Sequence, residues 1–345
     1  MRLIAVFLFL SFSVYAQDTV KVATVAGLQL DQAYALGITA LQNNRFPQAD
    51  SVLTAIIDMQ PLQDKAYALR AVARVKMGQN EAGLKDIAVA IQKNPTNAET
   101  WFNKSLIHLA AQQTDSQKVA LDRCLAIKSD HAEAAYYKGV WHYNRGEYDK
   151  AIQFYTIATD ARRDFTNAYN DRASCKRALN DLSGAIADYE RALVTDSSSA
   201  VILNNLGSAL RLNKSYEKAI AYYTMALRKD ARYVPAYLNR GVTYQESGAL
   251  DKAIADFERV ITLDPKNAAA YNNLAAIAIK QNDYKKAKEL ADKSIERDAR
   301  NGAAYYNRGI ANQMLREDAD CCSDWKKAAE LGIESAKTLM YASCH

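Results

Sequence analysis

The sequence repeats itself every 34 residues, and this period constrains the fold more than any other feature of the chain. The segments NDRA (170–173), NNLG (204–207), LNRG (238–241), NNLA (272–275) and YNRG (306–309) align at this spacing. A repeat of this length is one supersecondary unit that buries its apolar face by stacking on its neighbours. Nine repeats fit without insertion, and they begin at Leu30, Asp64, Ala98, Ala132, Thr166, Ala200, Val234, Ala268 and Gly302.

Three places within the repeat, numbered from 1 to 34, carry most of the pattern. Place 8 is always small, as a close helix–helix crossing requires, and place 20 is Ala in six repeats. Place 24 is large in every repeat but the eighth, and Pro61, Pro95 and Pro265 stand at place 32, where a helix should stop. Each repeat therefore predicts two amphipathic helices joined by a turn. The third repeat, 98–131, has Gln117 at place 20 and no closing Pro, so we expect local distortion there.

This pattern resembles the tetratricopeptide repeat family, which has small residues at places 8 and 20, aromatic residues near 4, 11 and 24, and Pro near 32. The resemblance covers residues 30–335. It implies an all-α, right-handed α-solenoid of nine tandem helix-turn-helix repeats, with the first helices lining a concave groove. We expect residues 336–345 to form a C-terminal cap, and residues 325–332 are similar to the endings of secreted tetratricopeptide and Sel1-like repeat proteins.

Arg stands at place 7 in four repeats, and the same four repeats have Asp at place 23. A charge this close to a helix–helix contact must be paired, and the planar Arg fork can meet a carboxylate through two hydrogen bonds. A row of Arg that faces an acidic ligand is the alternative, but the Asp residues already neutralise it. We therefore predict the ion pairs Arg70–Asp86, Arg172–Asp188, Arg240–Asp256 and Arg308–Asp324.

The first sixteen residues, MRLIAVFLFLSFSVYA, combine an early Arg2 with an apolar core and small or apolar residues before Gln17. They predict a cleaved signal peptide over 1–16, a linker over 17–29, and a periplasmic or secreted protein. A retained membrane anchor is the alternative, but the apolar stretch is shorter than the ~20 residues that a membrane span needs.

Five cysteines in an exported chain leave at least one unpaired. Cys124 and Cys175 are expected to be buried thiols. Cys321 fills the small place 20 of the last repeat, which leaves Cys322 able to turn toward the cap. We predict a Cys322–Cys344 disulfide, with Cys321–Cys344 and fully reduced thiols as the alternatives.

No catalytic motif is found: the sequence has no Gly-rich phosphate loop, nucleophile elbow or His-Glu-x-x-His helix. His108 and His142 both occupy place 11, where the family packs an aromatic ring, so we interpret them as core residues rather than as metal ligands of an enzyme. The net charge is +5, without a basic run interleaved with aromatic residues, so no nucleic-acid partner is indicated. We expect no cofactor, no metal and no enzymatic activity.

On the family's pattern, places 2, 5, 6, 9, 12 and 13 face the groove. An Asn ladder at place 6 can hydrogen-bond the backbone of an extended peptide, and aromatic side chains join it. The predicted peptide-binding residues are Asn103, Asn205, Asn239, Asn273, Asn307, Tyr34, Phe102, Tyr136, Tyr137, Tyr143 and Tyr306.

The family's chaperone-tail clamp is absent, since no repeat has Lys at place 5 or Asn at place 9. We interpret the chain as a non-enzymatic scaffold that holds a protein or peptide partner in the cell envelope. The alternative is a structural subunit that assembles through its convex face and ends.

Overall fold

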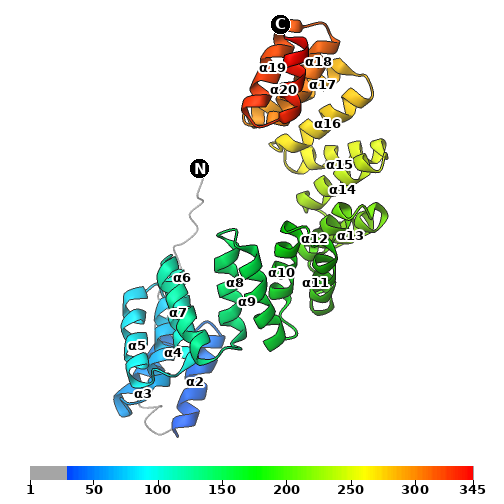
Figure 1. Ribbon diagram of the computed structural model, residues 1–345. Helices are drawn as coiled ribbons and strands as arrows, with labels where there is room; N and C mark the ends of the chain where they lie inside the picture. The colour runs from blue at the N-terminus through cyan, green and yellow to red at the C-terminus, as the bar shows by residue number, and fades with distance from the viewer. Residues whose placement is uncertain (1–28, 345) are drawn as a thin grey trace, which may run out of the picture. The chain divides into compact units, whose positions relative to one another are not determined.

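The computed structural model describes residues 29–344, and all regular structure within that range is α-helical (Figure 1). The predicted all-α fold is thereby confirmed. The predicted signal peptide, linker residues 17–28 and His345 lie outside the described residues. In the described range no helix is long and apolar enough to cross a membrane. The chain divides after Arg163 into two compact bodies.

The first body contains four helix pairs, and the first helix of each pair begins where the 34-residue pattern begins a repeat. The pairs are α2 (Leu30–Gln42) with α3 (Phe46–Met59), α4 (Asp64–Lys76) with α5 (Asn80–Lys93), α6 (Ala98–Ala110) with α7 (Thr114–Ile127), and α8 (Ala132–Tyr143) with α9 (Tyr148–Ala161).

The second body contains five pairs and one further helix. The pairs are α10 (Thr166–Ala178) with α11 (Leu182–Thr195), α12 (Ala200–Leu212) with α13 (Tyr216–Lys229), α14 (Val234–Glu246) with α15 (Leu250–Leu263), α16 (Ala268–Lys280) with α17 (Tyr284–Arg297), and α18 (Gly302–Met314) with α19 (Asp318–Glu330). The further helix, α20 (Glu334–Ser343), packs on α19.

The contact between places 8 and 24 sets the approach of the two helices within a repeat. A Cβ added to Gly241 would lie 2.7 Å from the Phe257 ring, and one added to Gly309 would lie 2.4 Å from Nε1 of Trp325. Both large side chains are fully buried. The place-24 ring therefore occupies the space that a place-8 side chain would need, which explains why place 8 is small.

The turn between the two helices reverses at place 15, which has a positive φ in all nine repeats. Asn or Gly, which adopt this left-handed conformation most readily, stand there in six repeats. The nine residues are Asn44, Gly78, Gln112, Gly146, Asn180, Lys214, Gly248, Asn282 and Arg316.

The C-terminal helix α20 covers the end of the last repeat. Ala336 is buried in a cluster with Cys321, Trp325 and Ala328, and the Cys322–Cys344 disulfide ties the helix end to α19. The helix begins at Glu334, two residues before the predicted cap. Cys124, Cys175 and Cys321 are buried and take no part in this disulfide.

The local distortion expected in the third repeat does not appear in the lengths of its helices. Helices α6 and α7 have 13 and 14 residues, like α4 and α5 before them. Gln117 is accommodated at the buried place 20. The irregularity of this repeat is instead a cavity of about 520 Å³ between α5, α6 and α7, beside Trp101 and Val119.

Candidate functional site

Two of the predicted groove residues at place 5, Tyr34 and Phe102, pack against the next repeat rather than into an open groove. Phe102 is 6% exposed, and its ring centroid lies 6.0 Å from that of Tyr137 in the following repeat. Tyr34 is 7% exposed and belongs to a core cluster that includes Leu69 of the following repeat. The prediction that Tyr34 and Phe102 line the groove is therefore wrong, because the first helix of the next repeat covers these two side chains.

The other predicted aromatic residues differ in their burial. Tyr136 and Tyr306, also at place 5, are half-buried. The ring centroid of Tyr136 lies 5.8 Å from that of Tyr155. Tyr306 packs against the buried cluster that contains Trp325 and Ala336. Tyr137 is half-buried and Tyr143 is exposed, so part of each side chain is accessible to solvent.

Three members of the Asn ladder bond the preceding repeat. The side-chain amide of each donates to an Asn at place 5, 35 residues earlier, and the amide of Asn239 also donates to Oγ of Ser208 at 3.4 Å. The bonds are Asn205 to Asn170 (3.1 Å), Asn239 to Asn204 (3.0 Å) and Asn307 to Asn272 (2.8 Å). The signal was readable in the sequence as pairs of Asn at a spacing of 35.

The remaining two, Asn103 and Asn273, follow repeats with Ala68 and Leu238 at place 5, which have no amide to offer. Among the described residues neither side chain has a hydrogen-bond partner. Their amides are therefore available to a ligand.

Asn103 lies at a cavity of about 400 Å³ formed by α4, α6 and α8. Its walls are mainly apolar, and Leu109 is 42% exposed there. Such a cavity can take an apolar side chain while the amide hydrogen-bonds the adjoining backbone. Apart from Ile107, the lining comes from places 6, 9, 12 and 13: Val72, Val75, Lys76, Asn103, Leu106, Ile107, Leu109, Ala110 and Tyr137.

The four predicted ion pairs are present, and none of their Asp residues is more than 6% exposed. In each pair both Nε and Nη2 of the Arg donate to the carboxylate. The Nη2–Oδ1 distances are 2.7 Å for Arg70–Asp86, Arg172–Asp188 and Arg240–Asp256, and 2.6 Å for Arg308–Asp324. Hydrogen bonding to Asp256 raises the pKa of Arg240, which keeps the charge in place.

Arg70 and Arg240 each also bond a third helix, a contact that was not predicted from the sequence. Nη1 of Arg70 donates to Thr54 at 3.1 Å, and Nη1 of Arg240 donates to Thr224 at 2.9 Å, in both cases at place 25 of the preceding repeat. We call the space around places 7, 11 and 23 of one repeat the seam. Where the preceding repeat belongs to the same body, its places 21 and 25 also border this space. A Tyr ring at place 4 lies against each guanidinium, with its centroid 5.3–5.6 Å from Cζ of the Arg. These residues are Tyr67, Tyr169, Tyr237 and Tyr305.

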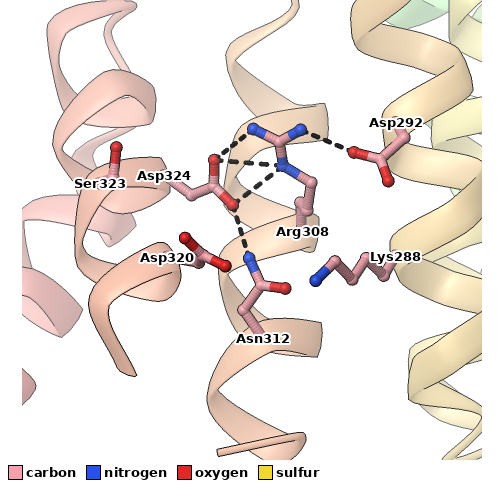
Figure 2. A pocket seen from close by; sticks show the side chains of 7 residues that line it. All are labelled: Lys288, Asp292, Arg308, Asn312, Asp320, Ser323 and Asp324. Atoms are coloured by element: carbon pink, nitrogen blue, oxygen red, sulfur yellow. Dashed lines mark hydrogen bonds and ion pairs between the residues drawn. The ribbon is translucent and has the colours of Figure 1, made fainter. Parts of the chain in front are cut away.

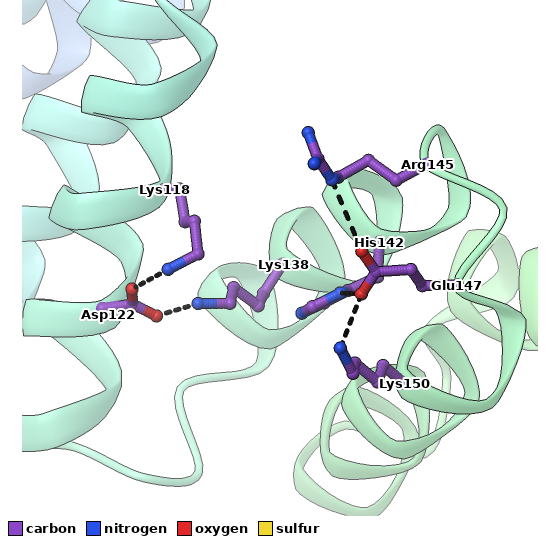
Figure 3. Close-up of polar contacts among 7 residues, drawn as sticks. All are labelled: Lys118, Asp122, Lys138, His142, Arg145, Glu147 and Lys150. Atoms are coloured by element: carbon purple, nitrogen blue, oxygen red, sulfur yellow. Dashed lines mark hydrogen bonds and ion pairs between the residues drawn. The ribbon is translucent and has the colours of Figure 1, made fainter.

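The seam of the fourth repeat replaces Arg by Lys138, whose ammonium contacts Asp122 at place 25 of the third repeat (Figure 3). In the same seam Nδ1 of His142 lies 3.0 Å from Oε2 of Glu147. The imidazole ring of His142 stacks on the Phe154 ring, with a distance of 5.2 Å between the ring centroids. Burial lowers the pKa of His142. This histidine is therefore a packed core residue.

His108 occupies the equivalent place in the third repeat, and its Nδ1 lies 2.7 Å from Oε1 of Gln113. Over the described residues no group of three or more His, Cys, Asp or Glu side chains could hold a metal ion.

Comparison with known proteins agrees with this geometry. Family models described as Tetratricopeptide repeat match residues 119–165 and 170–234, and 244–307. The chain belongs to the tetratricopeptide repeat family. A TPR repeat-containing protein of Methanocaldococcus jannaschii is 28% identical over 143 residues, which are 39% of this chain and 24% of that relative's length.

Solved tetratricopeptide repeat structures share the fold. The match to a tetratricopeptide repeat protein from Parabacteroides merdae covers 72% of this chain and 99% of that protein's chain, with a TM-score of 0.60 and 18% sequence identity. YrrB is described as a TPR protein with an unusual peptide-binding site. The match to it covers 53% of this chain and 95% of the YrrB chain, with a TM-score of 0.50 and 19% sequence identity.

Proposed function

We propose that this tetratricopeptide repeat protein is a non-enzymatic scaffold that binds a peptide segment of a protein partner on its first helices. The cavity at Asn103 is the observation that carries the proposal. It joins an apolar pocket to an amide without a partner, which is the combination that fixes an anchor side chain and its backbone. The helices around it are preformed, so binding has to order only the partner.

The family supports this proposal in general terms, because tetratricopeptide repeats usually serve protein–protein interaction. The peptide-binding site attributed to YrrB is a property of that protein, and its likeness to this chain extends to the fold. The partner's expected chemistry comes instead from the cavity: an apolar anchor beside a backbone group that bonds Asn103.

We propose further that the protein works outside the cytoplasm. The Cys322–Cys344 disulfide supports this location, since such bonds persist mainly in oxidising compartments. The signal-like residues 1–16 support it as well. An N-terminus at Gln17 in protein purified from its own cells, measured by mass spectrometry, is the expected result; an intact Met1 would contradict it.

Selection of peptides from a displayed random library on the purified chain tests the binding proposal. Enriched peptides should share one apolar anchor, and Leu109→Asp should weaken their binding by ten-fold or more. Val194→Asp is the matched control, because Val194 is also an exposed apolar residue, 71% exposed, but lies on the second helix α11. Equal effects of the two substitutions would contradict the proposed site.

A further inference from the structure

A second cavity, of about 210 Å³, lies in the seam of the ninth repeat (Figure 2). It is bounded by α17, α18 and α19 and is lined almost entirely by polar side chains. It is remote in sequence from the Asn103 cavity and shares no residue with it. The lining residues are Lys288, Asp292, Arg308, Asn312, Asp320, Ser323 and Asp324.

Place 11 fills the equivalent seam in the other repeats that have an Arg–Asp pair. Arg74 donates to Asp86 at 2.9 Å in the second repeat, and Lys176 lies 2.8 Å from Asp188 in the fifth. In the seventh repeat the ring of Tyr244 lies 5.8 Å from the Arg240 guanidinium. The ninth repeat has the shorter, uncharged Asn312 at this place, and the cavity is the space that it leaves.

Asn312 has a hydrogen-bond acceptor without a donor. Its Nδ2 donates to Oδ2 of Asp324 at 3.0 Å, whereas its Oδ1 is buried and has no partner within residues 29–344. The residue is 2% exposed. Figure 2 shows this oxygen directed away from Asp324, toward the side of the cavity where Lys288 lies. A buried acceptor normally has a donor, because leaving it unpaired costs free energy.

The cavity lining also has fewer cationic side chains than carboxylates. In the second repeat, Arg70 and Arg74 face two carboxylates, those of Asp50 and Asp86. In the ninth repeat Arg308 is shared between Asp324 and Asp292, and the lining also includes the carboxylate of Asp320. Lys288 is the other cation of the lining, and its ammonium contacts Glu317.

We propose that this cavity binds the cationic end of an Arg or Lys side chain from a protein partner. The incoming guanidinium or ammonium would donate to Oδ1 of Asn312 and to the Asp320 carboxylate. It would take the place that Arg74 and Lys176 occupy in their own seams. Three observations point to this one chemistry: the unpaired acceptor of Asn312, the exposed Asp320 carboxylate, which bonds no other described side chain, and the lack of the place-11 cation that the second and fifth repeats have.

A titration followed by amide NMR tests the proposal with Nα-acetyl-arginine methylamide as the probe. The matched control is the citrulline analogue, which has nearly the same shape but no charge. Saturable shifts centred on the Asn312 side chain and the Ser323 amide are expected, with an affinity at least ten-fold higher for the arginine probe. Equal responses to both probes, or shifts centred elsewhere, would overturn the proposal.

Two variants decide what occupies the cavity. Asn312→Lys supplies the chain's own cation, as Lys176 does in the fifth repeat, and should abolish the response to the arginine probe. If the wild-type protein gives no response but Lys288→Met does, Lys288 itself fills the cavity, and the proposal is wrong. Leu109→Asp should leave the response unchanged, which separates this site from the Asn103 cavity.

Discussion

The sixth and seventh repeats are neighbours that solve the same packing problem in different ways. In the sixth repeat, Leu206 at place 7 and Tyr222 at place 23 belong to one apolar cluster. In the seventh, Arg240 and Asp256 stand at these places and form a nearly buried ion pair. Both repeats keep Gly at place 8 against an aromatic ring at place 24. The difference teaches that places 8 and 24 set the helix geometry, whereas the seam tolerates either chemistry provided that both places change together.

Removing one partner of the pair should have the largest effect. Asp256→Ala leaves a nearly buried guanidinium without its carboxylate and should cost about 3 kcal/mol of unfolding free energy, the lower end of the range for buried pairs. Urea unfolding measures the loss, and hydrogen exchange should place it in α14 and α15. The control is Arg240→Leu with Asp256→Tyr, which copies the sixth repeat and should retain most of the stability. A single variant as stable as the wild type would contradict the role of the pair.

Substitution at place 8 should have the next largest effect. Gly309→Ala forces the Trp325 ring to move and should destabilise the protein by about 1–3 kcal/mol, the usual cost of overpacking. In Gly37→Ala the new Cβ would lie 3.3 Å from the nearest atom of Leu53, and the gain in helix propensity offsets the smaller strain. Thermal unfolding of the two variants gives the comparison. A Gly37→Ala protein less stable than Gly309→Ala would refute the proposed geometry.

The bonds between Asn at places 5 and 6 should contribute less. Asn239→Ala removes the donor to the buried Asn204 and should cost about 1 kcal/mol, the net worth of a typical hydrogen bond. Asn273→Ala is the control, because Asn273 has no such bond and should change stability little. Chemical unfolding of both variants tests the difference, and similar losses would show that the bond contributes nothing.

The smallest effect concerns pH in the fourth repeat, whose seam has Lys138 and Phe154 in place of the Arg–Asp pair and His142 beside them. Burial lowers the pKa of His142 in the folded state, so the unfolded chain binds the proton more readily. Stability from this residue is therefore present above about pH 6.5, the ordinary histidine pKa, and is lost as pH falls below it. His142→Phe should reduce the loss of stability between pH 7 and pH 5. The same pH dependence in both proteins would refute this assignment.

The period and the covarying Arg and Asp residues were enough to predict the all-α fold and to pair places 7 and 23. Both signals lie within one repeat, where the spacing of 16 residues relates two packed helices. The predictions were wrong where adjacent repeats meet. Tyr34 and Phe102 were assigned to the groove as if the first helix were a free surface, but the first helix of the next repeat covers both side chains. The contact of Arg240 with Thr224 was missed for the same reason, since it joins places in different repeats.

The most direct test of the binding account is crosslinking in the protein's own cells, with a photoreactive residue in place of Asn103 or of Val194. The account predicts one abundant partner that is trapped from position 103, is absent from position 194, and is lost when Leu109→Asp is added. Crosslinks only to other copies of the chain, or the same products from both positions, would contradict a peptide-binding surface on the first helices and would favour a structural subunit.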